Sequence, residues 1–255
     1  MTALDTRLRR LRLGYMAQVL DAQNTESLQH KHSYLEFLEA LVDGELATRD
    51  NKALSKRIKA ARFPVAKTLA EFDFDFQPKL DVKLLKTLAT CEFIDRKETV
   101  ILIGQPGTGK THLAIALGMR ACEAGYNVRF TTIQELAAEL RAAMADETME
   151  DHIADLVEPD LVILDELGFT RLDALLADAF YRIVASRYER AATIVTSNKS
   201  FESWGEVFPD PVIASAVLDR LVHHAHLVAI VGESYRMKEL KARSKKRGNS
   251  ATAQA

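Results

Sequence analysis

The sequence predicts an α/β domain whose parallel sheet is covered by helices on both faces, preceded by a small helical domain. From residue 80 onward, short apolar runs alternate with longer stretches of helical periodicity. The apolar runs are continuous, as expected of parallel strands that are buried on both faces. Residues 1–68 contain helical patterns only, without strand-like or glycine-rich stretches.

In residues 1–68, apolar side chains recur at helical intervals. One stripe extends from Leu4 to Val19, and a second predicted helix spans 35–46. A third predicted helix spans 54–61 and ends before Pro64, because the residue preceding a proline disfavours helix. We expect a small helical domain with basic faces. The alternative is that these helices are only a packing layer on the following domain.

The alternating segment defines the second predicted domain. Its predicted strands are 99–103, 127–132, 161–164, 193–196 and 227–231. Its predicted helices are 82–93, 112–124, 133–144 with a polar extension to about 156, 174–190 and 212–224. We therefore expect a helical domain at 1–68, an α/β domain at 69–247 and a small, polar, disordered tail at 248–255.

Composition is that of an ordinary soluble protein. The chain has 255 residues, a formal net charge of −2, 47% hydrophobic and 27% charged residues. No apolar run approaches the ~20 residues that span a bilayer, and the N-terminus does not resemble a signal peptide. The two cysteines lack metal or redox spacing. We expect a cytoplasmic protein without a membrane partner.

The strongest local signal is a phosphate-binding loop between a predicted strand and a predicted helix. Its glycines let the backbone curl round a phosphate, and the N–H groups of loop and helix point at the anion. Lys110 would contact the β- and γ-phosphates, and the Thr111 hydroxyl would hold Mg²⁺. The sequence therefore predicts ATP and Mg²⁺ as cofactors. The loop residues are Gly104, Gln105, Pro106, Gly107, Thr108, Gly109, Lys110 and Thr111.

Two acids follow the predicted strand 161–164. Asp165 and Glu166 would lie at the carboxyl end of that strand, where ligands bind in an open α/β sheet. Asp165 would hold Mg²⁺, directly or through water, and Glu166 would orient and deprotonate an attacking water. A base for water favours hydrolysis over phosphoryl transfer to a metabolite. The alternative is a solvated loop that merely follows a core strand.

Polar groups also follow the predicted strand 193–196. Asn198 would lie between the acids and the γ-phosphate, where its amide can donate to phosphate and accept from water. The alternative is that Asn198 only caps the helix near Phe201. Upstream, residues 68–79 alternate phenylalanines with aspartates. We expect an edge strand or an extended arm that packs on the core, and a less favoured alternative is that it borders the adenine.

Basic residues gather in three clusters. They lie at residues 7–12, 52–62 and 236–247, with acidic residues concentrated between, at 146–165. Such clusters are usually solvated faces or tails. In a protein with a phosphate-binding loop, three of them favour a nucleic-acid partner.

Taken together, these segments resemble AAA+ ATPases, and more narrowly the DnaC-type helicase loaders and the IstB transposition helpers. The resemblance covers most of residues 70–238 and two segments nearer the N-terminus. The matching segments are GQPGTGKTHLA at 104–114, VRFTT at 128–132, LVILDELGF at 161–169, IVTSNKSFESWGEVF at 194–208, LDRLVHH at 218–224 and GESYRMK at 232–238. The segments similar to IstB proteins are LRLGYMAQVL at 11–20 and EFDFDFQPKL at 71–80.

The resemblance implies further roles. Arg220 matches the arginine that reaches the γ-phosphate of a neighbouring subunit, and Arg236 matches a sensor arginine acting within its own subunit. Alternatives are that Arg220 pairs with Asp219 or Glu206 and that Arg236 belongs to the basic tail. His223, His224 and His226 have poor spacing for one metal site, so we expect ordinary surface or core histidines.

The resulting hypothesis is a DNA-dependent AAA+ ATPase that assists a transposase. ATP would assemble a homo-oligomer head to tail through shared sites, and basic surfaces would bind double-stranded DNA through its phosphates. The main rival is a replicative helicase loader of the DnaC type. A small-metabolite kinase and a nucleotide-binding scaffold without catalysis are further alternatives.

Overall fold

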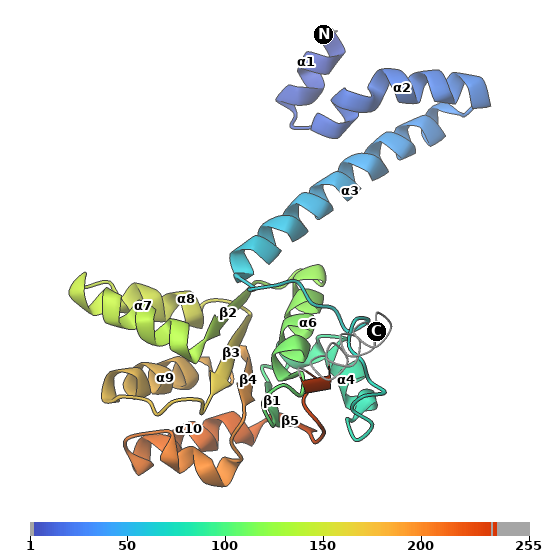
Figure 1. Cartoon of the computed structure of the whole chain (residues 1–255). Helices are drawn as coiled ribbons and strands as arrows, with labels where there is room; N and C mark the ends of the chain where they lie inside the picture. The colour runs from blue at the N-terminus through green and yellow to red at the C-terminus, as the bar shows by residue number, and fades with distance from the viewer. Residues whose placement is uncertain (1–2, 236, 239–255) are drawn as a thin grey trace, which may run out of the picture. The chain divides into compact units, whose positions relative to one another are not determined.

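The computed structural model describes residues 3–235 and 237–238, and its contacts divide the chain into two compact units, Met1–Lys56 and Arg57–Ala255 (Figure 1). The helix α3 (Tyr34–Ala61) begins in the first unit and ends in the second. The expected tail at 248–255 lies outside the described residues. Within the described part of the chain, no helix is both long and apolar enough to cross a membrane.

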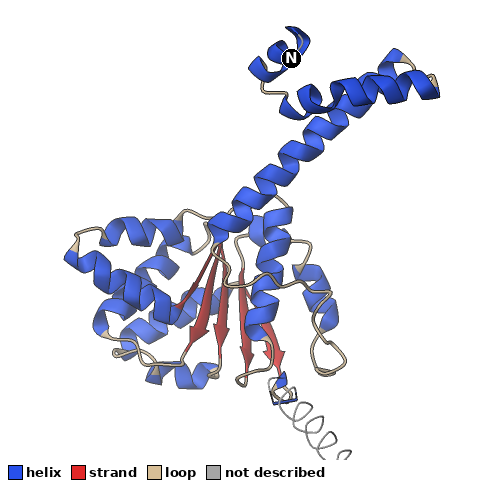
Figure 2. Ribbon diagram, turned by 45° about the horizontal axis from the view of Figure 1, so that its top comes forward, coloured by secondary structure: helices blue, strands red, loops and turns tan. Residues whose placement is uncertain are grey.

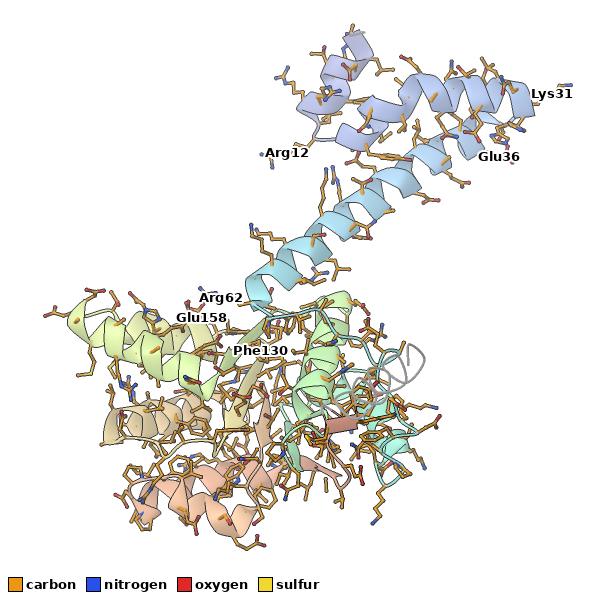
Figure 3. All side chains as sticks on the ribbon, viewed as in Figure 1. Arg12, Lys31, Glu36, Arg62, Phe130 and Glu158 are labelled. Carbon is orange, nitrogen blue, oxygen red and sulfur yellow. The ribbon has the colours of Figure 1, made fainter. Side chains whose placement is uncertain are left out.

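The first unit contains α1 (Ala3–Arg10), α2 (Gly14–His30) and the first part of α3. The apolar stripe from Leu4 to Val19 is therefore divided between two helices. Arg12 and Lys31, labelled in Figure 3, occupy the turns before and after α2 with φ of 60° and 54°. The two helices predicted at 35–46 and 54–61 form one continuous α3. The intervening residues lack apolar spacing but contain no strong helix breaker.

The helices of the first unit are joined by a small apolar cluster and one buried carboxylate. Leu8, Met16 and Leu41 form the cluster. Glu45 of α3 accepts hydrogen bonds from the backbone N–H groups of Tyr15 and Met16 at 2.9 and 3.2 Å. Since the first N–H groups of a helix have no partner within the helix, Glu45 caps α2 from a neighbouring element.

The second unit is built on a parallel sheet of five strands in the order β2-β3-β4-β1-β5. Because all strands run the same way, their carboxyl ends meet at one edge of the sheet, visible in Figure 2. Ile103 pairs there with Ser197, and Thr132 pairs with Asp165. The strands are β1 (Thr99–Gly104), β2 (Val128–Thr132), β3 (Leu161–Leu167), β4 (Ala192–Ser197) and β5 (Ala225–Ile230).

Helices cover both faces of this sheet, which confirms the predicted fold class. Alternate residues of β3 face opposite ways: Ile163 lies against α6, while Val162 and Leu164 belong to the apolar core shared with α7, α8, α9 and α10 (Figure 1). The helices are α4 (Val82–Leu88), α5 (Glu92–Asp95), α6 (Lys110–Glu123), α7 (Ile133–Ala145), α8 (Met149–Val157), α9 (Ala174–Arg187) and α10 (Pro211–His223), with the 3₁₀ helix η1 (Phe201–Glu206).

Two local predictions differ from the structure. The helix expected at 82–93 is divided into α4 and α5, because Cys91 adopts a left-handed conformation with φ of 67°. The segment 68–79 forms turns and contains no strand. Its phenylalanines stack locally: the ring centroids of Phe72 and Phe74 lie 5.0 Å apart.

The structural division at Lys56 falls earlier than the boundary expected at residue 68. The end of α3 and the residues just after it belong to the second unit, because their side chains contact α6 and β2. Arg57 donates to the carbonyl of Cys122 at 2.9 Å, and the ring of Phe63 lies 6.2 Å from that of Phe130.

A buried arginine holds the starting ends of β3 and β4. Arg187, the last residue of α9, is 1% exposed. Its guanidinium donates to the carbonyls of Leu156, Val157 and Pro159 at 2.8–3.0 Å and to that of Ala192. Burial lowers the pKa of Arg187 to about 9. One side chain thus satisfies carbonyls from the segment before β3 and from the first residue of β4.

We predict that Arg187→Leu destabilises the second unit by about 3 kcal/mol or more, because several buried carbonyls lose their donor together. The single tryptophan, Trp204, lies in the apolar core and reports unfolding by its fluorescence in a urea titration. Arg182→Ala on the same helix is the matched control. Its partner Glu150 is exposed, so we expect a change within about 1 kcal/mol. Equal midpoints for the two variants would refute the role of Arg187.

Candidate functional site

A pocket lies at the carboxyl edge of the sheet, where the predicted site residues were expected. The phosphate-binding loop forms one wall from Pro106 to Thr111, with Glu166 and Thr196 at the ends of neighbouring strands. Ligands of open α/β sheets bind at this edge. Further lining residues come from the segment 67–77 and from Tyr235.

The loop holds its shape through backbone conformation and its own carbonyls. Gly109 has a φ of 103°, which side-chain-bearing residues rarely adopt, and α6 begins immediately after it. A Cβ on Gly107 would lie 2.2 Å from the hydroxyl of Ser234. The Lys110 ammonium donates to the carbonyls of Gly104 and Gln105 at 2.8 and 3.0 Å. Because α6 begins directly after Gly109, its first N–H groups, which have no partner within the helix, are directed toward the loop, as anion binding requires.

A carboxylate buried beneath the pocket connects three elements. Asp165 of β3 is 2% exposed and accepts hydrogen bonds from the hydroxyl of Thr111 at 2.9 and 3.0 Å and from that of Thr196 at 2.5 Å. Burial raises the pKa of Asp165, against the opposing effects of these hydroxyls and of Lys110. Hydroxyl and carboxylate oxygens are the ligands that Mg²⁺ prefers, so Thr111 and Asp165 fit a magnesium site.

Glu166 reaches the pocket through an irregularity in β3. The pairing of β3 with β4 shifts between Leu164 and Leu167, and Glu166 adopts a φ of 66°. Its N–H donates to the Thr196 hydroxyl at 3.0 Å. In a regular strand, adjacent side chains point to opposite faces of the sheet. The irregularity allows both buried Asp165 and pocket-lining Glu166 to lie next to the phosphate-binding loop.

Asn198 does not line the pocket but lies beside the turn that follows Glu166. A Cβ on Gly168 would be 3.3 Å from Asn198 Oδ1. That oxygen is buried and has no hydrogen-bond partner among the described residues. Asn198 does not cap the following helix, because Ser200 occupies the N-cap position of η1. Thr196, two residues earlier, is the side chain of β4 that lines the pocket.

Arg220 lies at the opposite edge of the sheet. It lines a separate cleft with Thr99 and Thr193, which are near the starts of their strands. Its guanidinium donates to the carbonyl of Ala216 at 2.8 Å and lies 5.3 Å from the ring centroid of Tyr181. A single chain therefore does not bring Arg220 to its own phosphate-binding loop.

Within the described residues, neither of the two acids considered as partners of Arg220 forms an ion pair with it. Glu206 pairs with Lys199 at 3.5 Å, and no ion pair between Arg220 and Asp219 occurs in the described part of the chain. Arg236 lies outside the described residues. The residue before it, Tyr235, donates its N–H to the carbonyl of Gly107 at 2.9 Å, which fixes that part of the chain to the loop.

The segment 67–77 does more than pack on the core of the second unit, since it also lines the pocket beside the phosphate-binding loop. Phe72 contacts His112 of α6, with ring centroids 5.3 Å apart, and Phe76 meets Tyr235 edge to face at 5.3 Å. The Lys238 ammonium lies 4.4 Å from the Phe76 ring centroid. Sequence reasoning favoured packing on the core. Only the fold shows that these aromatic rings gather beside the loop.

Known proteins of one family are similar to this sequence over nearly the full chain. The family model described as IstB-like ATP binding protein matches residues 6–244. The putative ATP-binding protein of insertion sequence IS21 from Pseudomonas aeruginosa is 41% identical over 239 residues, covering 94% of this chain and 90% of that protein. The putative ATP-binding protein of IS5376 from Geobacillus stearothermophilus is 40% identical over 237 residues, covering 93% and 94%.

Solved structures show the same fold at low sequence identity. DnaI matches with a TM-score of 0.55 and 23% identity, over 68% of this chain and 93% of that one. AMPPCP-bound DnaA from Aquifex aeolicus matches with a TM-score of 0.54 and 22% identity, over 70% of this chain and 54% of that one. With its parallel α/β fold, its phosphate-binding loop and these relatives matched over at least 90% of their length, the chain belongs to the family of IstB-like ATP-binding proteins of insertion sequences.

Proposed function

We propose that this protein hydrolyses ATP and couples hydrolysis to DNA transposition. The observation that carries the first part is the network of Thr111, Asp165 and Thr196 beneath the loop, with Glu166 directly beside it in the pocket. This arrangement offers a metal ligand set and a separate carboxylate. A scaffold that only binds nucleotide has no need of the second carboxylate.

Each residue then has a distinct task. Lys110 and the N–H groups of the loop bind the phosphates, and Thr111 with Asp165 hold Mg²⁺, which supplies neutralising charge at the phosphates. Glu166 accepts the proton of the attacking water. The buried side-chain oxygen of Asn198 lies next to the turn after Glu166 and has no hydrogen-bond partner among the described residues. A movement of that turn during hydrolysis would therefore change the surroundings of Asn198.

The position of Arg220 supports a site shared between subunits. The loop and Arg220 lie at opposite edges of one sheet, so a head-to-tail contact would present one edge to the other. Arg220 of one subunit would then stabilise charge developing on the γ-phosphate held by its neighbour. Arg236, expected to act within its own subunit, follows a residue that is tied to the loop.

The expected macromolecular partners are double-stranded DNA and a transposase. Basic side chains are exposed along α1 and the second half of α3, including Arg7, Arg10, Lys52, Lys56 and Lys59. Such side chains bind phosphates without reading bases. The relatives matched over at least 90% of their length are named for insertion sequences, and the family model begins to match at residue 6, so it covers the N-terminal region. This favours transposase assistance over helicase loading.

The proposed base is tested by Glu166→Gln, with Lys110→Ala as the matched variant. We expect Glu166→Gln to retain binding of a fluorescent ATP analogue and to lose about 10²- to 10⁴-fold in phosphate release, because only the proton acceptor is removed. Lys110→Ala should lose binding itself. Normal turnover by Glu166→Gln would exclude Glu166 as the base.

The shared site is tested by mixing two inactive variants. Arg220→Ala retains its own loop and base, whereas Glu166→Gln retains Arg220 and ATP binding. If Arg220 acts on a neighbour, the mixture regains ATPase activity at junctions where Glu166→Gln supplies the arginine. An arginine acting within its own subunit predicts no recovery at any mixing ratio.

DNA dependence is tested by measuring ATPase activity with and without duplex DNA over a series of salt concentrations. We expect stimulation by DNA that fades as salt rises, because phosphate contacts release counterions. Replacing Lys52, Lys56 and Lys59 together with glutamine should weaken stimulation while leaving DNA-free turnover unchanged. Indifference to DNA at low salt would contradict the proposal.

A further inference from the structure

A second cluster of chemically active side chains lies at the edge of the sheet opposite the nucleotide pocket. Glu189, His223 and His224 each offer one ligand atom, and these atoms lie within 4.8 Å of one another. All three residues are exposed, so an ion reaches them from solvent. His226, which the sequence grouped with the other two histidines, instead contacts Glu98 at 2.7 Å.

The ends of two helices bring these groups together. Adjacent residues within a helix point about 100° apart, but α10 ends at His223. His224 has φ of −124° and ψ of 61°, outside the helical range, and the two rings converge to a centroid distance of 4.0 Å. Glu189 follows the end of α9 with a left-handed φ of 57°. The convergence therefore depends on tertiary structure and is invisible in sequence spacing.

The spacing suits a small coordinated ion. Two ligands of a tetrahedral zinc ion, each about 2.0 Å from the metal, are about 3.3 Å apart. His224 Nε2 lies 3.6 Å from Glu189 Oε1. On the second histidine, His223 Nδ1 lies 2.7 Å from the hydroxyl oxygen of Tyr188. Metal-binding histidines commonly use one ring nitrogen for the ion and the other for an oxygen partner of this kind.

We propose that Glu189, His223 and His224 form a binding site for a borderline transition-metal ion of the Zn²⁺ type. Two imidazoles and one carboxylate leave a fourth position for water. Imidazole ligands select zinc, cobalt or nickel over magnesium, so this site does not compete for the ion held by Thr111 and Asp165.

Occupancy of the site would clamp the ends of α9 and α10 together. His223 and His224 follow Arg220 by three and four residues, and His224 lines the same cleft as Arg220. The bound ion thus stiffens the surface that carries Arg220. Metal binding itself requires neither ATP nor a second subunit, so the inference stands independently of the proposed ATPase cycle.

The test is calorimetric titration of Zn²⁺ into the full-length, nucleotide-free protein, purified without an affinity tag and dialysed against a chelator. We expect one Zn²⁺ per chain and an increase in melting temperature on binding. Replacing His223 and His224 together with alanine should weaken binding at least about 100-fold, and Glu189→Gln or Tyr188→Phe about tenfold. His152→Ala, on α8 and outside the cluster, is the control and should bind as the native protein does.

Two results would overturn the site. The first is absence of binding by the native protein at micromolar Zn²⁺. The second is equal binding by the native protein and the double histidine variant, which would place the ion elsewhere. Circular dichroism of each variant separates loss of ligands from loss of fold. Retention of Zn²⁺ in a large excess of Mg²⁺ supports selection by imidazole.

Discussion

The buried carboxylate of Asp165 is the point on which the site depends. It accepts hydroxyl hydrogen bonds from the helix after the phosphate-binding loop and from β4, so three elements converge on one side chain. Burial without these donors would be costly for a charged group. Because the hydroxyl of Thr111 is both a donor to Asp165 and an expected metal ligand, internal hydrogen bonding places the two groups of the proposed magnesium site together.

Much of this arrangement was predictable because it is local in sequence. The phosphate-binding loop is a contiguous motif, and a continuous apolar strand ending in acids identifies β3. The sequence predicts Asn198, which follows the strand 193–196, as the polar group beside the acids. Only the pairing of β3 with β4 shows that Thr196, within that strand, faces Asp165. The sequence offers segment 68–79 beside the nucleotide only as a less favoured alternative, and it does not predict the contact of Phe76 with Tyr235, because these residues are distant in sequence. Arg187 was indistinguishable from a solvated charge at a helix end.

The two edges of the sheet carry different chemistry. The carboxyl edge holds the loop, the acids and the aromatic wall, and the starting edge holds Arg220, Arg187 and the histidine pair. Arg187 lies in the same cleft as Arg220 and binds the carbonyls before β3, the strand that ends in Asp165. The central strands thus connect the proposed subunit-contact surface with the nucleotide pocket.

The left-handed backbone of Glu166 has a further consequence. For a residue with a side chain, that conformation is disfavoured by roughly 1 kcal/mol or more, whereas glycine adopts it without steric cost. The local backbone would therefore be less strained without the carboxylate that the proposed chemistry needs. Stability and turnover make opposite demands at this one position. A search for thermally robust variants that ignored activity would favour the loss of Glu166.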